Sequence, residues 1–256
     1  MFGRFRKRSN ELEHIDKGDY TPEEYEGCII ELQRVNRWMG DAWALDRSLL
    51  REIKNSRSSN VSVLDVGAGS GELLRITARW AKENRKHVQL VGLELNERSA
   101  GAISEDSPAE ISAVRADAFH LPFADNSFDY VISSLFTHHF EDEQVVALLR
   151  EMNRVTRQHT FVIDLHRHPI AYLLYTTVGR LVLHTRLLRE DGALSILRSF
   201  KPEELKLLAE RAGLGHIRVG RSFPFRVVLR AQKENADTHL HQDRDPDVVE
   251  NLRLAS

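Results

Sequence analysis

Short apolar runs and amphipathic segments alternate through the middle of the chain. The apolar runs predict strands at 61–66, 88–94, 111–115, 128–133 and 159–165. Between and after them, apolar side chains recur every three or four residues and predict helices at 71–83, 97–104, 141–156 and 202–212. This alternation is typical of a mostly parallel sheet with helices on both faces, so the predicted fold class is α/β. Residues 216–220 and 225–230 fit two final strands.

A helical segment is predicted ahead of the first strand. Thr21 is a suitable N-cap, Pro22 fits the first helical position, and Glu24 completes a capping box. A second helical stretch follows over 42–53. We therefore expect an N-terminal helical cap over 20–58 and a main domain over 59–232.

Both ends of the chain are strongly charged. Residues 1–19 include a basic cluster interleaved with phenylalanines, and we expect a flexible N-terminus, with a weak membrane-surface contact as the alternative. Residues 233–256 contain few apolar side chains and predict a charged, flexible tail.

Composition narrows the classes of partner. The 36 basic and 38 acidic residues give a net charge of −2, which disfavours a nucleic-acid partner. The single cysteine excludes an intramolecular disulfide and fits a reducing, cytoplasmic compartment. The most apolar segment, 169–184, contains Arg180 and is too short to span a bilayer, so no stable membrane insertion is expected.

A glycine-rich loop follows the first predicted strand. Gly67, Gly69 and Gly71 stand at alternate positions after Asp65, and a helix is predicted to start at once. Such a turn lets a ligand approach bare backbone at the carboxyl end of a strand. The spacing is D-x-G-x-G-x-G rather than the dinucleotide fingerprint G-x-G-x-x-G.

Three further motifs follow in order. Glu94 ends the second predicted strand, Asp117 follows the third, and a Leu-Pro-Phe-Ala-Asp-Asn-Ser-Phe-Asp phrase at 121–129 leads into the fourth. Together with the glycine loop they resemble the motifs of class I S-adenosylmethionine-dependent methyltransferases. The 121–129 phrase is most similar to small-molecule enzymes of the quinone-biosynthesis type.

This resemblance implies a seven-stranded, Rossmann-like sheet that ends in an antiparallel hairpin, with S-adenosyl-L-methionine as the cofactor. Glu94 would accept the ribose hydroxyls, because a carboxylate is a multi-site acceptor, and Asp117 would accept the adenine amino group. The predicted cofactor-binding residues are Asp65, Gly67, Ala68, Gly69, Gly71, Glu94, Leu95, Asp117, Ala118, Phe119, Ser133 and Ser134. In related enzymes an insertion like 167–199 covers the carboxyl edge of the sheet and shapes the acceptor pocket; extra core packing is the alternative.

Four histidines follow strand ends at the predicted catalytic edge. His138 and His139 come after the fourth strand, and His166 and His168 after the fifth. A pKa near 6.5 suits histidine as the base that deprotonates a hydroxyl acceptor. We rank His139 first and His166 second as the catalytic base. No metal is expected, because these residues do not complete a ligand set.

The predicted function is O-methylation of a small aromatic or polyketide-like acceptor in specialised metabolite biosynthesis. C-methylation of a quinol-type ring and non-catalytic binding of S-adenosylmethionine are the alternatives, and a homodimer is left open. A nicotinamide-dependent oxidoreductase is disfavoured, because none of the tyrosines considered (Tyr130, Tyr172 and Tyr175) has a lysine four residues later. Amino-group methylation of DNA or protein is disfavoured too, because Ser133–Phe136 stands where those enzymes often carry an Asn/Asp-Pro-Pro-aromatic stretch.

Overall fold

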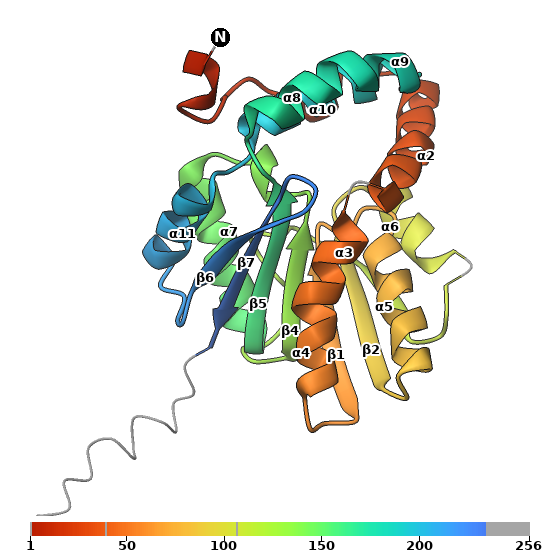
Figure 1. The fold of residues 1–256 in the computed structure, drawn as a ribbon. Helices are drawn as coiled ribbons and strands as arrows, with labels where there is room; N and C mark the ends of the chain where they lie inside the picture. Colours follow the sequence, from red (N-terminus) through yellow and green to blue (C-terminus); the bar gives the residue numbers. More distant parts are fainter. Residues whose placement is uncertain (1, 39, 106, 234–256) are drawn as a thin grey trace, which may run out of the picture.

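The computed structural model describes residues 2–38, 40–105 and 107–233, and a seven-stranded sheet forms its centre (Figure 1). The strand order is β3-β2-β1-β4-β5-β7-β6. Strands β1 to β5 run parallel, while β7 pairs antiparallel with both β5 and β6. The strands are β1 Asn60–Val66, β2 His87–Glu94, β3 Ile111–Arg115, β4 Phe128–Ser134, β5 Thr156–Leu165, β6 Arg218–Ser222 and β7 Arg226–Gln232. The predicted α/β class and the terminal hairpin are confirmed.

Helices cover both faces of the sheet, because alternate residues of the central strands are apolar on opposite sides. On one face, the core that contains Val63 also includes side chains of α3 (Asp41–Leu45), the π-helical turn η2 (Asp46–Leu50), α4 (Arg51–Asn55), α5 (Glu72–Glu83) and α6 (Glu97–Ser104). On the other face, the core that contains Leu64 includes side chains of α7 (Asp142–Val155) and α11 (Pro202–Arg211). The sheet therefore lies between two apolar cores.

The carboxyl edge is covered by the N-terminal region and by the insertion (Figure 1). The covering elements are η1 (Phe2–Phe5), α1 (His14–Lys17), α2 (Pro22–Trp38), α8 (Pro169–Leu174), η4 (Tyr175–Gly179), α9 (Arg180–Val182) and α10 (Arg186–Arg198). Cys28 of α2 packs against Leu187 and Leu188 of α10 in a third, smaller core. None of the described helices combines the length and the apolar character needed to cross a membrane.

Residues 2–19 make hydrogen bonds with distant parts of the chain. The guanidinium of Arg8 donates to the side chain of Asp142 and to the carbonyl of Phe140. Asp191 of α10 accepts the backbone N–H groups of His14 and Ile15, at 2.8 and 3.2 Å. These partners lie far along the chain, so the charge pattern of the terminus alone did not reveal them. The predicted tail lies outside the described residues from 234 onward.

Candidate active site

The glycine loop between β1 and α5 places bare backbone at the carboxyl edge. Gly67, Gly69 and Gly71 all have positive φ, at 73°, 54° and 81°. A Cβ at Gly67 would overlap the ring of Phe136, whereas a Cβ at Gly69 would meet open space. The loop therefore needs glycine at Gly67 to pack against Phe136, and at Gly69 it leaves room for a ligand against the backbone.

The loop opens onto a cavity of about 260 Å³. Gly67, Ala68 and Gly69 line one part of it, and the roof includes Tyr175 and Leu187. A larger groove of about 1090 Å³ runs between the α3–α4 segment and β6. That groove is lined by none of the predicted site residues. The smaller cavity is therefore the candidate active site.

Asp65 is the acidic residue at the end of β1 and lines this cavity. It is 2% exposed, and its Oδ1 atom has no hydrogen-bond partner among the described residues. Burial, reinforced by the charge of Glu94, raises the pKa of Asp65 to about 7. A buried carboxylate of this kind suits a cationic ligand group, because an opposite charge restores its ionised form. The ammonium of S-adenosylmethionine fits that requirement.

The carboxylates of Glu94 and Asp117 are each oriented by hydrogen bonds from backbone N–H groups. Glu94 accepts the N–H of Gly69 at 3.0 Å through one oxygen and the N–H of Leu95 at 2.9 Å through the other. The first bond ties the carboxylate to the glycine loop. Asp117 accepts the N–H of Phe119 at 2.9 Å and pairs with His120 at 3.0 Å. These two bonds hold the pKa of Asp117 below its usual value, so it is an ionised acceptor.

The remaining predicted cofactor contacts occupy different environments. Ser134 lines the cavity. Ser133 is fully buried, and its hydroxyl donates to the carbonyl of Val66 at 2.8 Å, so it joins β4 to β1. Ala118 lies in the core, while Leu95 is 64% exposed. Successive side chains of a strand point to opposite faces of the sheet, so the neighbouring residues Ser133 and Ser134 lie in different environments.

His138 is held in a fixed orientation by Asp164 of β5. The 3₁₀ turn η3 (Thr137–His139) follows β4, and there His138 Nδ1 lies 2.7 Å from Asp164 Oδ1. Asp164 also accepts the backbone N–H of His138 and the hydroxyl of Thr137. Although burial opposes its ionisation, these partners lower the pKa of Asp164 to about 2. Because an ionised Asp164 only accepts hydrogen bonds, Nδ1 of His138 carries the proton of this bond, and in the neutral ring the lone pair is then on Nε2.

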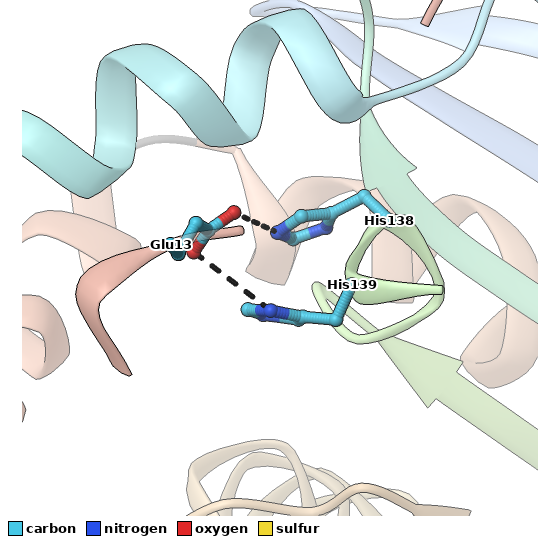
Figure 2. Close-up of side chains that lie close together, drawn as sticks. All are labelled: Glu13, His138 and His139. Atoms are coloured by element: carbon cyan, nitrogen blue, oxygen red, sulfur yellow. Dashed lines mark ion pairs between the residues drawn. The ribbon is translucent and has the colours of Figure 1, made fainter. Parts of the chain in front are cut away.

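Glu13, which no sequence motif marks as a site residue, faces both histidines (Figure 2). Its Oε1 lies 3.8 Å from His138 Nε2, and its Oε2 lies 3.8 Å from His139 Nδ1. Ser195 donates to Oε1 at 2.9 Å. Burial raises the pKa of Glu13 to about 7, and the charge of Asp16 adds to this. Glu13, His138 and His139 all line the cavity and together form its polar group.

The same polar group has donor atoms close enough to hold a metal ion. Those of Glu13, His138 and His139 lie within 4.8 Å of one another. However, Arg198 Nε lies 3.7 Å from Glu13 Oε1, and its Nη1 lies 3.4 Å from Asp16 Oδ2. This permanent cation offsets part of the charge of the two carboxylates and would repel a metal ion there. We therefore interpret the polar group as an acid–base group.

His166 and His168 lie outside this group. Neither is among the residues that line the cavity. Burial, together with the charge of Arg221, lowers the pKa of His166 to about 4. His168 accepts the N–H of Ile170 at 3.2 Å and caps helix α8. Their contacts are those of structural residues.

Asp41 and Arg226 form a second buried feature of the cavity wall. Arg226 Nε and Nη2 lie 2.6 and 3.0 Å from the two carboxylate oxygens of Asp41. The pair ties the start of α3 to β7. It holds the N-terminal helices against the carboxyl edge of the sheet.

Comparisons with known proteins identify the family and the fold. A family model described as a methyltransferase domain matches residues 64–163. Over 174 residues the chain is 31% identical to a demethylmenaquinone methyltransferase of Staphylococcus aureus, covering 62% of this chain and 70% of that protein.

Two solved structures share the fold. A SAM-dependent methyltransferase from Aquifex aeolicus gives a TM-score of 0.54 at 16% identity, covering 79% of this chain and 98% of that one. Human N-acetylserotonin methyltransferase in complex with SAM gives 0.58 at 18% identity, covering 83% of this chain and 57% of that one.

Proposed function

Because the chain belongs to the class I S-adenosylmethionine-dependent methyltransferases, we propose that it transfers a methyl group to a hydroxyl oxygen of a small aromatic or polyketide-like molecule. One observation carries the proposal. The donor loop and the oriented imidazole of His138 line the same cavity, and Asp164 leaves His138 Nε2 free to accept a proton.

The residues of the chain perform three tasks in this reaction. S-adenosylmethionine supplies an electrophilic methyl group on a sulfonium. The glycine loop, Asp65 and Glu94 position the donor, which accounts for much of the catalysis in a displacement of this kind. His138 Nε2 takes the hydroxyl proton while the oxygen–carbon bond forms and the sulfur–carbon bond breaks. The ionised Asp164 stabilises the resulting imidazolium.

The shape of the cavity supports an apolar acceptor. Its lining includes Leu32, Leu135, Leu187 and Ile196, and one cluster of polar side chains in it consists of Glu13, His138, His139 and Ser195. An acceptor with an apolar body and one hydroxyl fits that distribution, because a few placed polar groups orient a ligand in an apolar pocket.

C-methylation of a quinol-type ring is the second candidate, and the demethylmenaquinone methyltransferase relative favours it. His138 would serve there as well, because removing a ring hydroxyl proton makes the neighbouring carbon nucleophilic. The two reactions differ in the atom that receives the methyl group.

Turnover with S-adenosylmethionine tests the proposal. The purified protein is incubated with panels of phenols, polyketide-like hydroxyls and quinols, and S-adenosylhomocysteine is measured. We expect its formation to depend on the acceptor. If the donor binds but no acceptor supports turnover, the chain is a non-catalytic S-adenosylmethionine-binding protein and the proposal fails.

A further inference from the structure

The outer surface of the insertion is unusually apolar. Six large apolar side chains within 13 residues of α8, η4 and α9 are between 47% and 86% exposed. They are Ile170, Leu173, Leu174, Val178, Leu181 and Val182, and we call this surface the outer roof. Contiguous exposed apolar side chains of this kind mark an interaction surface, because leaving them in water is unfavourable.

A basic segment lies directly beside the outer roof. The ring of Phe5 packs edge-on against Tyr172 of α8, with ring centroids 5.6 Å apart. The Arg4 guanidinium lies 5.6 Å from the centre of the same ring. Figure 1 shows η1 next to α8, above the carboxyl edge. Arg4, Arg6 and Lys7 are exposed.

The charged residues within the two segments are all basic. Residues 1–10 contain four basic residues and no acidic one, and residues 169–185 contain no acidic residue. The whole chain carries a net charge of −2, so this is a local concentration. Apolar side chains flanked by basic ones favour one occupant, the surface of an anionic bilayer, where lipid tails meet the former and headgroups the latter.

We propose that the outer roof and the basic segment bind an anionic membrane surface peripherally. The contact lies in the interfacial plane. Six apolar side chains and three exposed basic ones provide the two signals that stable peripheral attachment requires.

This orientation places the candidate active site against the bilayer. The segment that forms the outer roof also sends Tyr175 inward to the cavity, and Leu187 and Leu188 of α10 lie beside it. A lipophilic acceptor that leaves the bilayer would therefore meet the roof first. The assignment of a membrane-soluble acceptor rests on the proposed function, whereas the proposed membrane contact does not depend on it.

Vesicle co-sedimentation of the full chain tests the contact. We expect the protein to pellet with phosphatidylglycerol vesicles, much less with phosphatidylcholine vesicles, and less as salt is raised. Leu181→Asp and Leu173→Asp should each remove most of the bound fraction. The matched control is Leu207→Asp on α11, which is also an exposed leucine at 57% and should bind like the wild type.

Charge-reversal variants test the contribution of the basic segment. Arg4→Glu and Lys7→Glu should each weaken binding at least about fivefold. The control is Lys54→Glu on α4, an exposed lysine away from the outer roof. All these variants should keep wild-type turnover of a water-soluble acceptor, because none changes a cavity residue.

Three results would overturn the membrane contact. These are no pelleting of the wild type with anionic vesicles, equal loss in the control variants, or an oligomer that Leu181→Asp turns into a monomer in gel filtration. The last result would mean that a second copy covers the outer roof. Vesicle binding without methyl transfer to any acceptor would contradict only the proposed function.

Discussion

His138 Nδ1 lies 2.7 Å from Asp164 Oδ1, in a cavity that the donor-binding loop also lines. Asp164 is fully buried and ionised, so the histidine keeps one tautomer. Its Nε2 atom then faces Glu13, which also lines the cavity. In the proposed reaction, this pair orients the base where the acceptor meets the donor.

Replacing the base should separate catalysis from donor binding. His138→Gln should lower turnover by about 10²–10⁴-fold, the usual contribution of a positioned base. The affinity for S-adenosylhomocysteine, measured by calorimetry, should stay unchanged. His166→Gln is the control and should retain near wild-type turnover, because His166 lies outside the cavity lining. Full turnover in His138→Gln would remove this residue from the mechanism.

A side chain at Gly69 should block donor binding. A Cβ there meets open space, where it fills the place of the donor, but the positive φ of 54° also strains the backbone of Gly69→Val. We expect S-adenosylhomocysteine binding to fall below detection in calorimetry. Gly213→Val is matched, since Gly213 also has positive φ and open surroundings. If both variants bind the ligand equally well, the loop does not hold the donor.

Asp65 should make donor binding depend on pH. Because the pKa of Asp65 is about 7 in the folded chain, the side chain is a neutral carboxylic acid below that pH. It attracts the ligand's ammonium only in the ionised form that predominates above pH 7. Affinity for S-adenosylhomocysteine should rise up to about tenfold per unit between roughly pH 6 and pH 7 and then level off. Asp65→Asn should abolish this slope, and a slope that persists in the variant would assign it to another group.

The same pKa has an opposite consequence for the ligand-free protein. Because the folded chain holds the proton of Asp65 more tightly than the unfolded chain, this contribution to stability is complete below about pH 4 and is lost as pH rises through 7. The melting temperature of Asp65→Asn should fall less over that range than that of the wild type. Thermal unfolding from pH 5 to pH 8 measures the difference.

The roof of the cavity depends on a glycine in α10. A Cβ at Gly192 would overlap the hydroxyl of Tyr175, which donates to the carbonyl of Leu188. Gly192→Ala should therefore destabilise the protein by about 1–3 kcal/mol. Gly101→Ala in α6 meets no neighbouring atom and should be neutral or stabilising by about 0.4–1 kcal/mol. Chemical denaturation compares the unfolding midpoints of the two variants. Equal midpoints would show that Tyr175 and α10 accommodate the added methyl group without loss of stability.

Much of the sheet could be predicted from sequence because its signals are local. Strand β1, the glycine loop and α5 follow each other within one short stretch, and each is set by its own apolar pattern or glycine. Predicted and observed bounds of α6 agree, at 97–104. The Asp65 and Glu94 positions were predictable for the same reason, since both end strands.

The acid–base group was less predictable because its partners come from distant segments. The sequence ranked His139 above His138, and only the packing of η3 against β5 shows that His138 has Asp164 as its partner. Glu13 lay in a segment whose charge suggested flexibility. Its burial depends on Asp191 and Ser195 of the insertion, whose placement over the cavity no local pattern encodes.

The most direct test of the proposed reaction is the identity of the methylated atom. The protein is supplied with S-adenosylmethionine labelled with ¹³C in the methyl group and with an acceptor that supports turnover, and the product is examined by NMR. We predict that the labelled carbon appears as an O–CH₃ group and that His138→Gln strongly slows its formation. A label in a C–CH₃ group, or the same O–CH₃ rate in the variant, would contradict O-methylation with His138 as the base.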